Sequence, residues 1–306
     1  MKIAIIGCTE ILYDVAERLH AEGHGLVCIL TAKEAPEYTR TADDFRALAE
    51  RYNVPFAQGG RIQDSCDFLQ EAGAEIAVSI NYTGVIPHEV IDLFPLGILN
   101  AHGGDLPKYR GNACQAWAIL NGEKRIGLCI HRMIGGELDS GDIITREYLS
   151  IDHDTKVTQV WEWMVQRTPE LMVEAVTRLS SEPDYVLERQ SKDPKDALRC
   201  YPRKPEDGRI DWHQTALNIL RLINASNKPY AGAFCDYEGE KLIIWDAELV
   251  NDDELFCAVP GQVTKIGEGF VEVACGEGRL RLLGIEMDQQ AIKPSELIRS
   301  IRKRLA

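Results

Sequence analysis

Short apolar runs alternate with amphipathic segments over the first 185 residues, and this alternation constrains the fold more than any other feature of the sequence. It starts with an apolar run over 2–8, continues with a periodic polar segment over 11–21, and returns to an apolar run over 25–31. Further strands are expected over 75–80, 97–100, 126–133 and 143–149, and further helices over 42–52, 64–72, 113–121 and 155–180. This alternation predicts a doubly wound α/β domain with a parallel sheet.

The pattern changes after residue 190. Residues 191–208 contain three prolines and many charged residues, which predicts a linker or a long surface loop. Beyond them we expect a helix over 213–226 and a basic helix over 294–305. The short strands expected between these helices are separated by glycines and cover 231–237, 241–249, 261–265, 269–275 and 279–286. The sequence therefore predicts a first domain over 1–190 and a small β-barrel or sandwich over 209–306.

The nine cysteines are odd in number, widely spaced and without a CxxC pair. This pattern argues against a disulfide framework and a zinc site, so we expect reduced thiols, no metal and a cytoplasmic protein. No stretch approaches ~20 consecutive apolar residues, so no membrane helix is expected. The first turn, GCTEIL (7–12), has one glycine where a dinucleotide-binding turn needs three, so we expect Gly7 only to end a strand.

The chain is acidic, with 48 Asp and Glu residues against 34 Lys and Arg residues and a net charge of -14. A partner bound mainly through its phosphate charge needs a basic face, so this balance disfavours a polyanionic partner such as tRNA. It leaves open a small anionic ligand that a few local cations hold.

The stretch from Asn100 to Asp142 is the most informative for function. It opens with NAHGGDLPKYRGN (100–112) and closes with GGELDSGDI (135–143). Asn100 and His102 are two apart on an expected strand end, so they share a face, and Asp139 can meet them if the strands 97–100 and 126–133 are neighbours. A histidine can exchange protons, an aspartate can orient it, and an amide can donate to an oxyanion. The alternative is that all three only cap turns and loops.

Residues 97–142 resemble the formyltransferases that use N10-formyltetrahydrofolate. The matching features are the Asn-x-His pair, the segment LPKYRG (106–111), Gly122 before a strand, and LDSGDI (138–143). Farther along, the segments 201–212 and 218–245 are similar to the hinge and the start of an OB-like C-terminal domain. Methionyl-tRNA formyltransferase and the sugar-nucleotide N-formyltransferases share that domain. The resemblance implies a Rossmann-like N-terminal domain, a smaller OB-like β-barrel, N10-formyltetrahydrofolate as cosubstrate and a homodimer.

By position, the resemblance implies that Asn100, His102 and Asp139 form the catalytic trio. The residues that it implies for folate binding are Gly84, Val85, Ile86, Asn112, Gly135, Gly136, Glu137, Leu138 and Asp139. Candidates for contact with the other substrate are Tyr82, Lys108, Arg110 and Arg132. Lys108 and Arg110 have an alternative role as braces of their own loop. His131 is expected to be packed rather than catalytic.

Three functions follow from this resemblance. The favoured one is formylation of a nucleotide-linked amino sugar for surface polysaccharide, and the alternative is formylation of methionyl-tRNA. The third is a non-catalytic folate-binding protein, which the intact trio disfavours. Within 32–44 there are two cations against four acidic residues, and within 203–306 there are 14 against 17. A tRNA-binding enzyme is expected to carry a basic track in these regions. The basic linker residues and the cations near the C-terminus are the evidence for tRNA.

Overall fold

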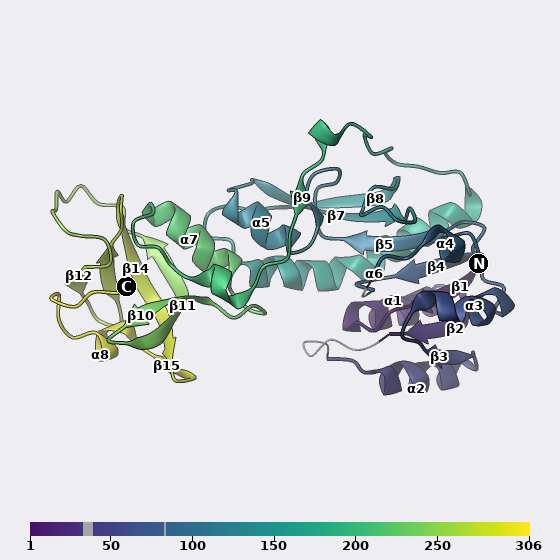
Figure 1. Cartoon of the computed structure of the whole chain (residues 1–306), viewed down its shortest axis with the longest axis horizontal. Coiled ribbons are helices and arrows are strands. Elements are labelled where there is room, and N and C mark those ends of the chain that lie inside the picture. Colours follow the sequence, from purple (N-terminus) through teal and green to yellow (C-terminus); the bar gives the residue numbers. More distant parts are fainter. Residues whose placement is uncertain (33–38, 83) are drawn as a thin grey trace. The chain divides into compact units, whose positions relative to one another are not determined.

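The computed structural model describes residues 1–32, 39–82 and 84–306, which are traced in colour in Figure 1. The loop 32–44, whose charges bear on the acceptor, therefore lies partly outside the described residues. The chain divides into two compact units. Unit 1 comprises Met1–Gly111, Gly127–Tyr148 and Trp163–Cys200, and unit 2 comprises Asn112–Ile126, Leu149–Glu162 and Tyr201–Ala306.

Unit 1 is built on a seven-stranded sheet with the order β3-β2-β1-β4-β5-β7-β8. In chain order these strands are β1 (Lys2–Ile6), β2 (Gly25–Thr31), β3 (Phe56–Gln58), β4 (Ile76–Ser79), β5 (Ile98–His102), β7 (Arg125–Arg132) and β8 (Ile143–Ser150). The first five are parallel, whereas β7 runs antiparallel to β5. The doubly wound α/β prediction is confirmed, and the sheet is mixed rather than wholly parallel.

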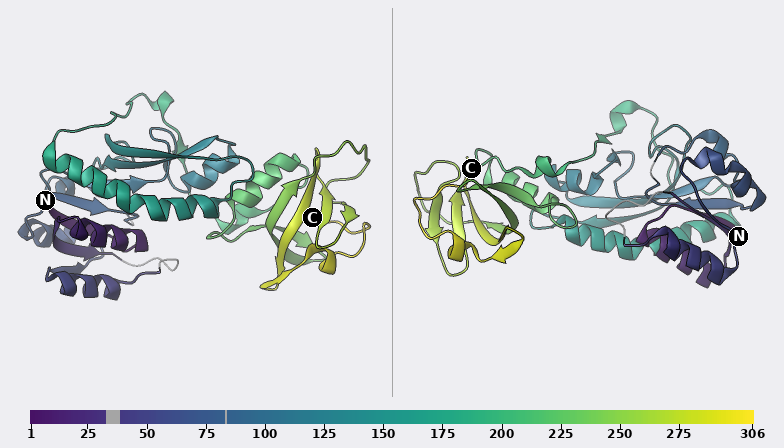
Figure 2. Two further views of the ribbon diagram at one scale, coloured as in Figure 1. Left: turned by 180° about the vertical axis from the view of Figure 1, so that it is seen from behind. Right: turned by 60° about the horizontal axis from the view of Figure 1, so that its bottom comes forward.

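Helices cover both faces of this sheet (Figure 2). One face carries η1 (Ile62–Ser65), α3 (Cys66–Glu71) and α4 (His88–Ile91), which share an apolar core with the sheet. The other face carries α1 (Glu10–Ala21), with α2 (Ala42–Tyr52) and α6 (Val157–Ser181) as its neighbours. The rings of Tyr13 and Phe45 are 5.5 Å apart between α1 and α2, and Arg18 lies 3.3 Å from Glu170 between α1 and α6.

Local chemistry fixes where the first helices begin. Thr9 accepts a hydrogen bond from the Leu12 N–H at 3.2 Å and so caps α1, and Thr41 forms a capping box with Asp44 at the start of α2. Gly7 has a φ of 136°, and an ideal Cβ there would lie 3.0 Å from the Ile80 carbonyl oxygen. The single glycine of the first turn is therefore explained by backbone packing.

Unit 2 contains α5 (Cys114–Leu120), α7 (Ala216–Ala225) and an antiparallel sheet with the order β10-β11-β14-β13-β12. Its strands are β10 (Ala233–Tyr237), β11 (Glu240–Leu249), β12 (Val263–Ile266), β13 (Val271–Ala274), β14 (Arg279–Met287) and β15 (Gln290–Ile292), which pairs with β14. One apolar core of side chains from α7 and these strands fills the unit. The predicted OB-like β domain is confirmed.

The prediction of a basic helix over 294–305 is wrong. Only α8 (Pro294–Leu297) forms, and the residues after it pair with strands. The Ala306 and Asp236 backbones exchange two hydrogen bonds beside β10, and Leu305 N–H donates to the Gly261 carbonyl just before β12. The C-terminal residues thus close the sheet into a barrel by bonding to both of its edge strands, while Ile298 and Leu305 fill the core.

Several short elements fall where no element was expected, including β3 and α4. The residues expected to form a linker hold η2 (Pro194–Asp196), η3 (Pro205–Gly208) and β9 (Arg199–Cys200), which pairs in parallel with β6 (Arg110–Gly111). All nine cysteines are free thiols. In the described part of the chain, no helix is long and apolar enough to span a membrane.

Candidate active site

β5 and β7 bring the polar side chains of the site into one row. Asn100 and His102 lie within β5, which extends two residues beyond the predicted strand, and they share one face. Because β7 pairs with β5, Asn100 lies opposite His131 and His102 lies opposite Cys129. β5 and β7 are therefore neighbours, which is the condition for Asp139 to meet Asn100 and His102.

Asp139 lies in the loop that connects β7 to β8. Its backbone is left-handed, with a φ of 48°, which non-glycine residues rarely adopt. Its Oδ2 accepts a hydrogen bond from the Gly111 N–H at 2.9 Å and lies 3.5 Å from His102 Nδ1. Its Oδ1 lies 3.5 Å from His131 Nε2. One carboxylate thus faces both histidines, and the predicted His102–Asp139 pair is formed.

The electrostatics of this pair keep the carboxylate ionised. Burial alone raises the pKa of Asp139, but His102, His131 and the Gly111 N–H together hold that pKa well below its usual range. Burial lowers the pKa of His102 from its ordinary value of 6.5, against the opposing effect of Asp139. At neutral pH the site therefore combines a charged carboxylate with a histidine that is able to take up a proton.

The backbone, rather than Asp139, fixes the tautomer of His102. Its Nε2 lies 2.6 Å from the Tyr109 carbonyl oxygen, which can only accept, so Nε2 carries a proton and donates it. The lone pair of the neutral ring is then at Nδ1, on the side of Asp139. An ideal Cβ on Gly104 would overlap the Tyr109 carbonyl oxygen, so only glycine permits this arrangement.

His131 is a member of the site that sequence reasoning missed. It is packed, as expected, with 1% of its surface exposed, but it contacts the site residues. Its Nδ1–H donates to the Arg132 carbonyl at 2.9 Å, which leaves Nε2 to accept a hydrogen bond from Asn100 Nδ2 at 3.2 Å. The available signal was its place on a strand beside β5, but the register that puts it opposite Asn100 cannot be read from one sequence.

Two of the segments that the resemblance implies for folate binding lie together in unit 1. An ideal Cβ on Gly135 would overlap the backbone of His88, so the loop 135–139 packs beside the end of the segment 84–88. Val85 is 63% exposed, whereas Ile86 is buried in the core. Gly84 is also exposed, so this segment offers accessible backbone beside the glycine-containing loop. Asn112 follows β6 in the chain and belongs to unit 2.

The four substrate candidates have different surroundings. Tyr82 packs against the apolar core that α4 shares with the sheet, and burial raises the pKa of its hydroxyl. Lys108 is exposed, whereas Arg110 donates two hydrogen bonds to the Gln190 side chain and Arg132 donates one to the Pro183 carbonyl. The contacts of Arg110 are those of a brace, the alternative role considered for it.

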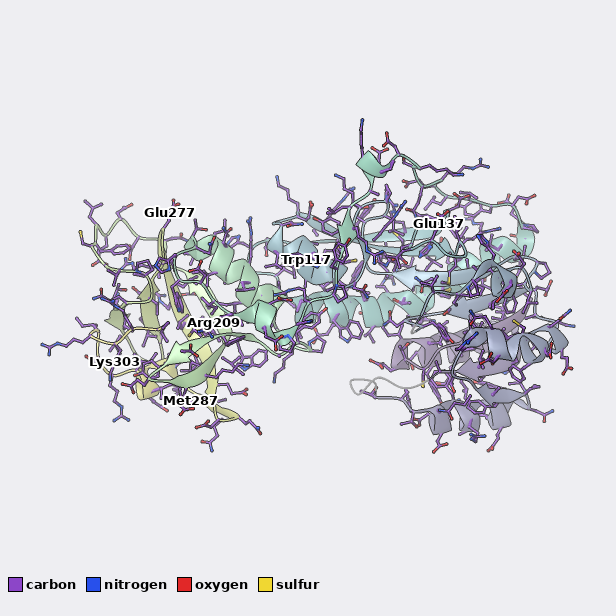
Figure 3. All side chains as sticks on the ribbon, viewed as in Figure 1. Trp117, Glu137, Arg209, Glu277, Met287 and Lys303 are labelled. Carbon is purple, nitrogen blue, oxygen red and sulfur yellow. The ribbon has the colours of Figure 1, made fainter. Side chains whose placement is uncertain are left out.

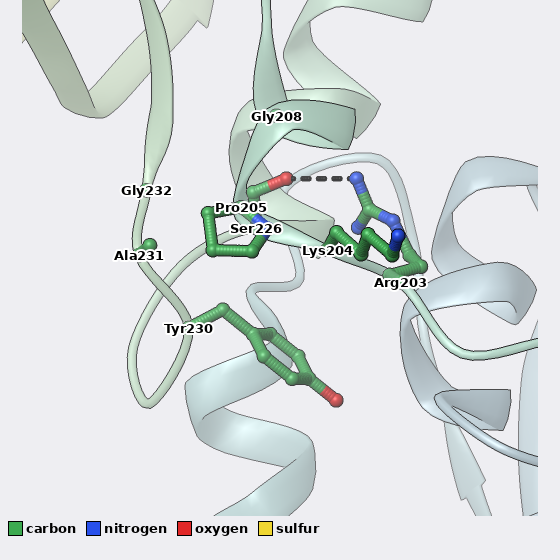
Figure 4. Close-up of a pocket in the computed structure, with 8 residues that line it drawn as sticks. All are labelled: Arg203, Lys204, Pro205, Gly208, Ser226, Tyr230, Ala231 and Gly232. Carbon is green, nitrogen blue, oxygen red and sulfur yellow. Dashed lines mark hydrogen bonds between the residues drawn. The ribbon is translucent and has the colours of Figure 1, made fainter.

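Unit 2 contains a small cavity of about 90 Å³, whose lining is drawn in Figure 4. Arg203 lines it and donates to Ser226 Oγ, to the Asp207 carbonyl and to the Ala225 carbonyl at the end of α7. Cations at a helix C-terminus are favoured by the helix dipole. The guanidinium of this basic linker residue is therefore engaged in holding the fold.

The sequence was compared with known proteins. Residues 1–176 match the Formyl transferase family, and residues 203–302 match the Formyl transferase, C-terminal domain family. Methionyl-tRNA formyltransferase from Caldanaerobacter subterraneus is 31% identical over 296 residues, which are 94% of this chain and 93% of that one. The enzyme of the same name from Solibacter usitatus is 30% identical over 94% of this chain and 91% of its own.

Solved structures show the same fold at lower identity. The N-formyltransferase from Helicobacter canadensis, in complex with folinic acid and dTDP-3-aminofucose, has a TM-score of 0.69 and 15% identity, covering 92% of this chain and 99% of that one. HypX from Aquifex aeolicus in complex with tetrahydrofolic acid has a TM-score of 0.62 and 17% identity over 97% of this chain. The chain spans about half the length of HypX, because the match covers 46% of it. The protein belongs to the formyl transferase family, and it is an N-formyltransferase that takes its formyl group from N10-formyltetrahydrofolate.

Proposed function

We propose that the acceptor is the amino group of a nucleotide-linked amino sugar, and that the reaction serves surface polysaccharide synthesis in the cytoplasm. The observation that carries this proposal is the pairing of cations in unit 2. A surface that binds tRNA needs cations that are available to phosphates. Here five cations already contact carboxylates: Arg279 (Asp252, Glu254, Glu272), Arg281 (Glu248, Glu272), Arg209 (Asp236), Lys156 (Asp246) and Lys303 (Glu238).

Two of the regions that supported tRNA as the acceptor support it less, because cations in them are already bonded to other groups of the protein. The basic C-terminal helix does not form, and its Lys303 pairs with Glu238; Lys303 and Arg209 are labelled in Figure 3. In the linker, Arg203 donates to the Ala225 carbonyl at the end of α7 and to the Asp207 carbonyl in η3. Together with the net charge of -14, these contacts favour a small acceptor over a polyanion.

In the reaction, the amine attacks the formyl carbon of N10-formyltetrahydrofolate to give a tetrahedral intermediate. The bond from that carbon to N10 then breaks, and tetrahydrofolate leaves with N10 carrying the proton that His102 took from the amine. Asn100 is the donor for the formyl oxygen as negative charge develops on it. One hydrogen of its Nδ2 is held by His131 Nε2, which fixes the orientation of the amide and leaves the second hydrogen to be donated. His131 therefore aims the donor rather than taking part in proton transfer.

His102 takes the proton that the attacking amine must lose. Because its Nε2–H is donated to the Tyr109 carbonyl, the proton enters at Nδ1. Asp139 faces that nitrogen and stabilises the imidazolium that forms. This differs from a Ser-His-Asp triad, where the carboxylate holds Nδ1–H and Nε2 is the base. The rest of the rate enhancement comes from holding the amine beside the formyl group.

The test is an assay of formyl transfer across UDP-, dTDP- and GDP-linked 3-amino and 4-amino sugars, with methionyl initiator tRNA as the competing acceptor. We expect at least one sugar to be formylated with kcat/KM at least about 10⁴ M⁻¹s⁻¹, within the usual range of enzymes, and tRNA to react far more slowly. Turnover of tRNA alone would overturn the proposal.

Methionyl-tRNA is the second candidate, and one observation favours it. The relatives that are 30–31% identical over 94% of this chain are named methionyl-tRNA formyltransferases. If tRNA is the acceptor, its binding must weaken steeply between about 50 and 200 mM salt, because each phosphate contact releases counterions. A KM for the acceptor that changes little over this range supports the sugar nucleotide.

A further inference from the structure

We infer that Gln190 is a positioning residue of the active site, which holds the loop that carries Asp139 in its place beside His102. The inference rests on the proposed roles of these two residues. Gln190 lies outside both family matches, which cover 1–176 and 203–302, and no feature of the sequence marked it. It belongs to unit 1, as do its hydrogen-bond partners Arg110, Asp139 and Gly141.

The Gln190 side chain is buried, and all of its hydrogen-bonding capacity is used. Its Nε2 donates to the Asp139 carbonyl at 2.9 Å and to the Gly141 carbonyl at 2.7 Å. Its Oε1 accepts from Arg110 Nη2 at 2.8 Å and from Arg110 Nε at 3.3 Å. A glutamine amide offers two donor hydrogens and two acceptor lone pairs, so no capacity is left over. Such complete pairing in a buried amide fixes the groups around it.

These contacts hold Asp139 from two sides. Gln190 binds its backbone carbonyl, while Gly111, the neighbour of Arg110, donates its N–H to the Asp139 carboxylate. The backbone of Asp139 is left-handed, a conformation that persists only where its surroundings hold it. A shift of about 1 Å in a catalytic group can cost about 10²-fold in rate.

The segment around Gln190 is itself fastened to the start of β8, which follows that loop, and to β6. On one side, the Ile143 N–H donates to the Glu188 carbonyl and the Leu187 N–H donates to the Ile143 carbonyl. On the other side, the Arg110 N–H donates to the Leu198 carbonyl, and β9 pairs with β6. Residues 187–200 therefore form a strap between the start of β8 and β6, and the amide of Gln190 lies within it.

The experiment compares the full-length wild type with Gln190→Glu, Gln190→Met, Asp139→Asn and the control Gln70→Met, which changes an exposed glutamine on α3. Gln190→Glu keeps the shape and the Arg110 contact but replaces the two donors by an oxygen that faces two carbonyls. We expect kcat to fall about 10- to 100-fold in both Gln190 variants and to be unchanged in the control. Thermal unfolding of each variant is measured alongside. If Gln190→Met does not fold, the kcat of Gln190→Glu alone tests the inference.

The pH profile of kcat separates positioning from a merely structural role. The groups that act on His102 are Asp139, which raises its pKa, and His131 and Arg110, which lower it, besides the Tyr109 carbonyl. Displacing Asp139 lowers the pKa of His102, so the acid limb of kcat in Gln190→Met should move to lower pH, in the direction of Asp139→Asn. The inference is overturned if the acid limb of kcat in Gln190→Met stays where it is in the wild type. It is also overturned if both Gln190 variants keep the wild-type kcat while Asp139→Asn is impaired. Wild-type kcat in Asp139→Asn overturns the proposed roles as well.

Discussion

At the scale of residues, hydrogen-bond partners set the tautomer of His102 and the orientation of the Asn100 amide. In the mechanism that we propose, the Tyr109 carbonyl leaves Nδ1 of His102 to accept the proton, and His131 holds one hydrogen of the Asn100 amide so that the other is left for the substrate. The sequence motif predicted Asn100, His102 and Asp139, and the structure brings them together. It could not predict His131 or Gln190, because their contacts depend on strand register and on a segment about 50 residues distant from Asp139.

Replacing His131 tests how the Asn100 amide is oriented. His131→Phe keeps an aromatic ring, although a larger one, in the buried site, and it removes the acceptor for Asn100 Nδ2 together with the donor to the Arg132 carbonyl. We expect kcat to fall about 10-fold or more, since removal of an oxyanion donor altogether costs about 10²–10³. The KM for N10-formyltetrahydrofolate should change little.

Steady-state kinetics measures this effect, with His213→Phe as the matched control because His213 is exposed on unit 2. Wild-type kcat in a well-folded His131→Phe protein would show that Asn100 needs no such partner.

At the scale of elements, the predicted bounds were good where one hydrophobic periodicity extends over many residues. They were poor where pairing with a distant segment determines the structure. The range of α2 agrees with the predicted 42–52 to the residue. The segment 294–305 also had helical features, but residues 303–306 bond to the edges of the barrel, and barrel closure leaves no edge unpaired. Pairing between distant segments outweighs a weak local preference, and one sequence does not show which segments pair.

Barrel closure predicts the effect of one core substitution. Leu305 is 2% exposed and packs in the core of unit 2, whereas Ile301, four residues earlier, is 54% exposed. Leu305→Ala should lower the free energy of unfolding by about 2–5 kcal/mol, because it leaves a cavity in a closed core. Ile301→Ala should change it by no more than about 0.5 kcal/mol.

Chemical denaturation followed by fluorescence measures both variants. Equal effects of the two substitutions would mean that the C-terminal residues do not close the barrel.

For the molecule as a whole, the fold bears on the reaction and the net charge bears on the acceptor. The α/β unit carries the residues to which we assign formyl transfer, and the family matches cover residues 1–176 and 203–302 of the chain. Carboxylates of unit 2 contact several of its cations, and these contacts bear on the proposed acceptor rather than on the reaction. Net charge acts over the whole surface, so composition bears on the acceptor that we propose. The expected homodimer stays a prediction.

The pH dependence of kcat in wild type and in Asp139→Asn tests the central claim most directly. Because burial holds the pKa of His102 below its ordinary value of 6.5, the acid limb of the wild type should lie below pH 6.5. Asp139→Asn should lower kcat by about 10²-fold or more and move the limb to still lower pH, since the carboxylate that raises the pKa of His102 is gone. Equal kcat values with coincident limbs would contradict the account.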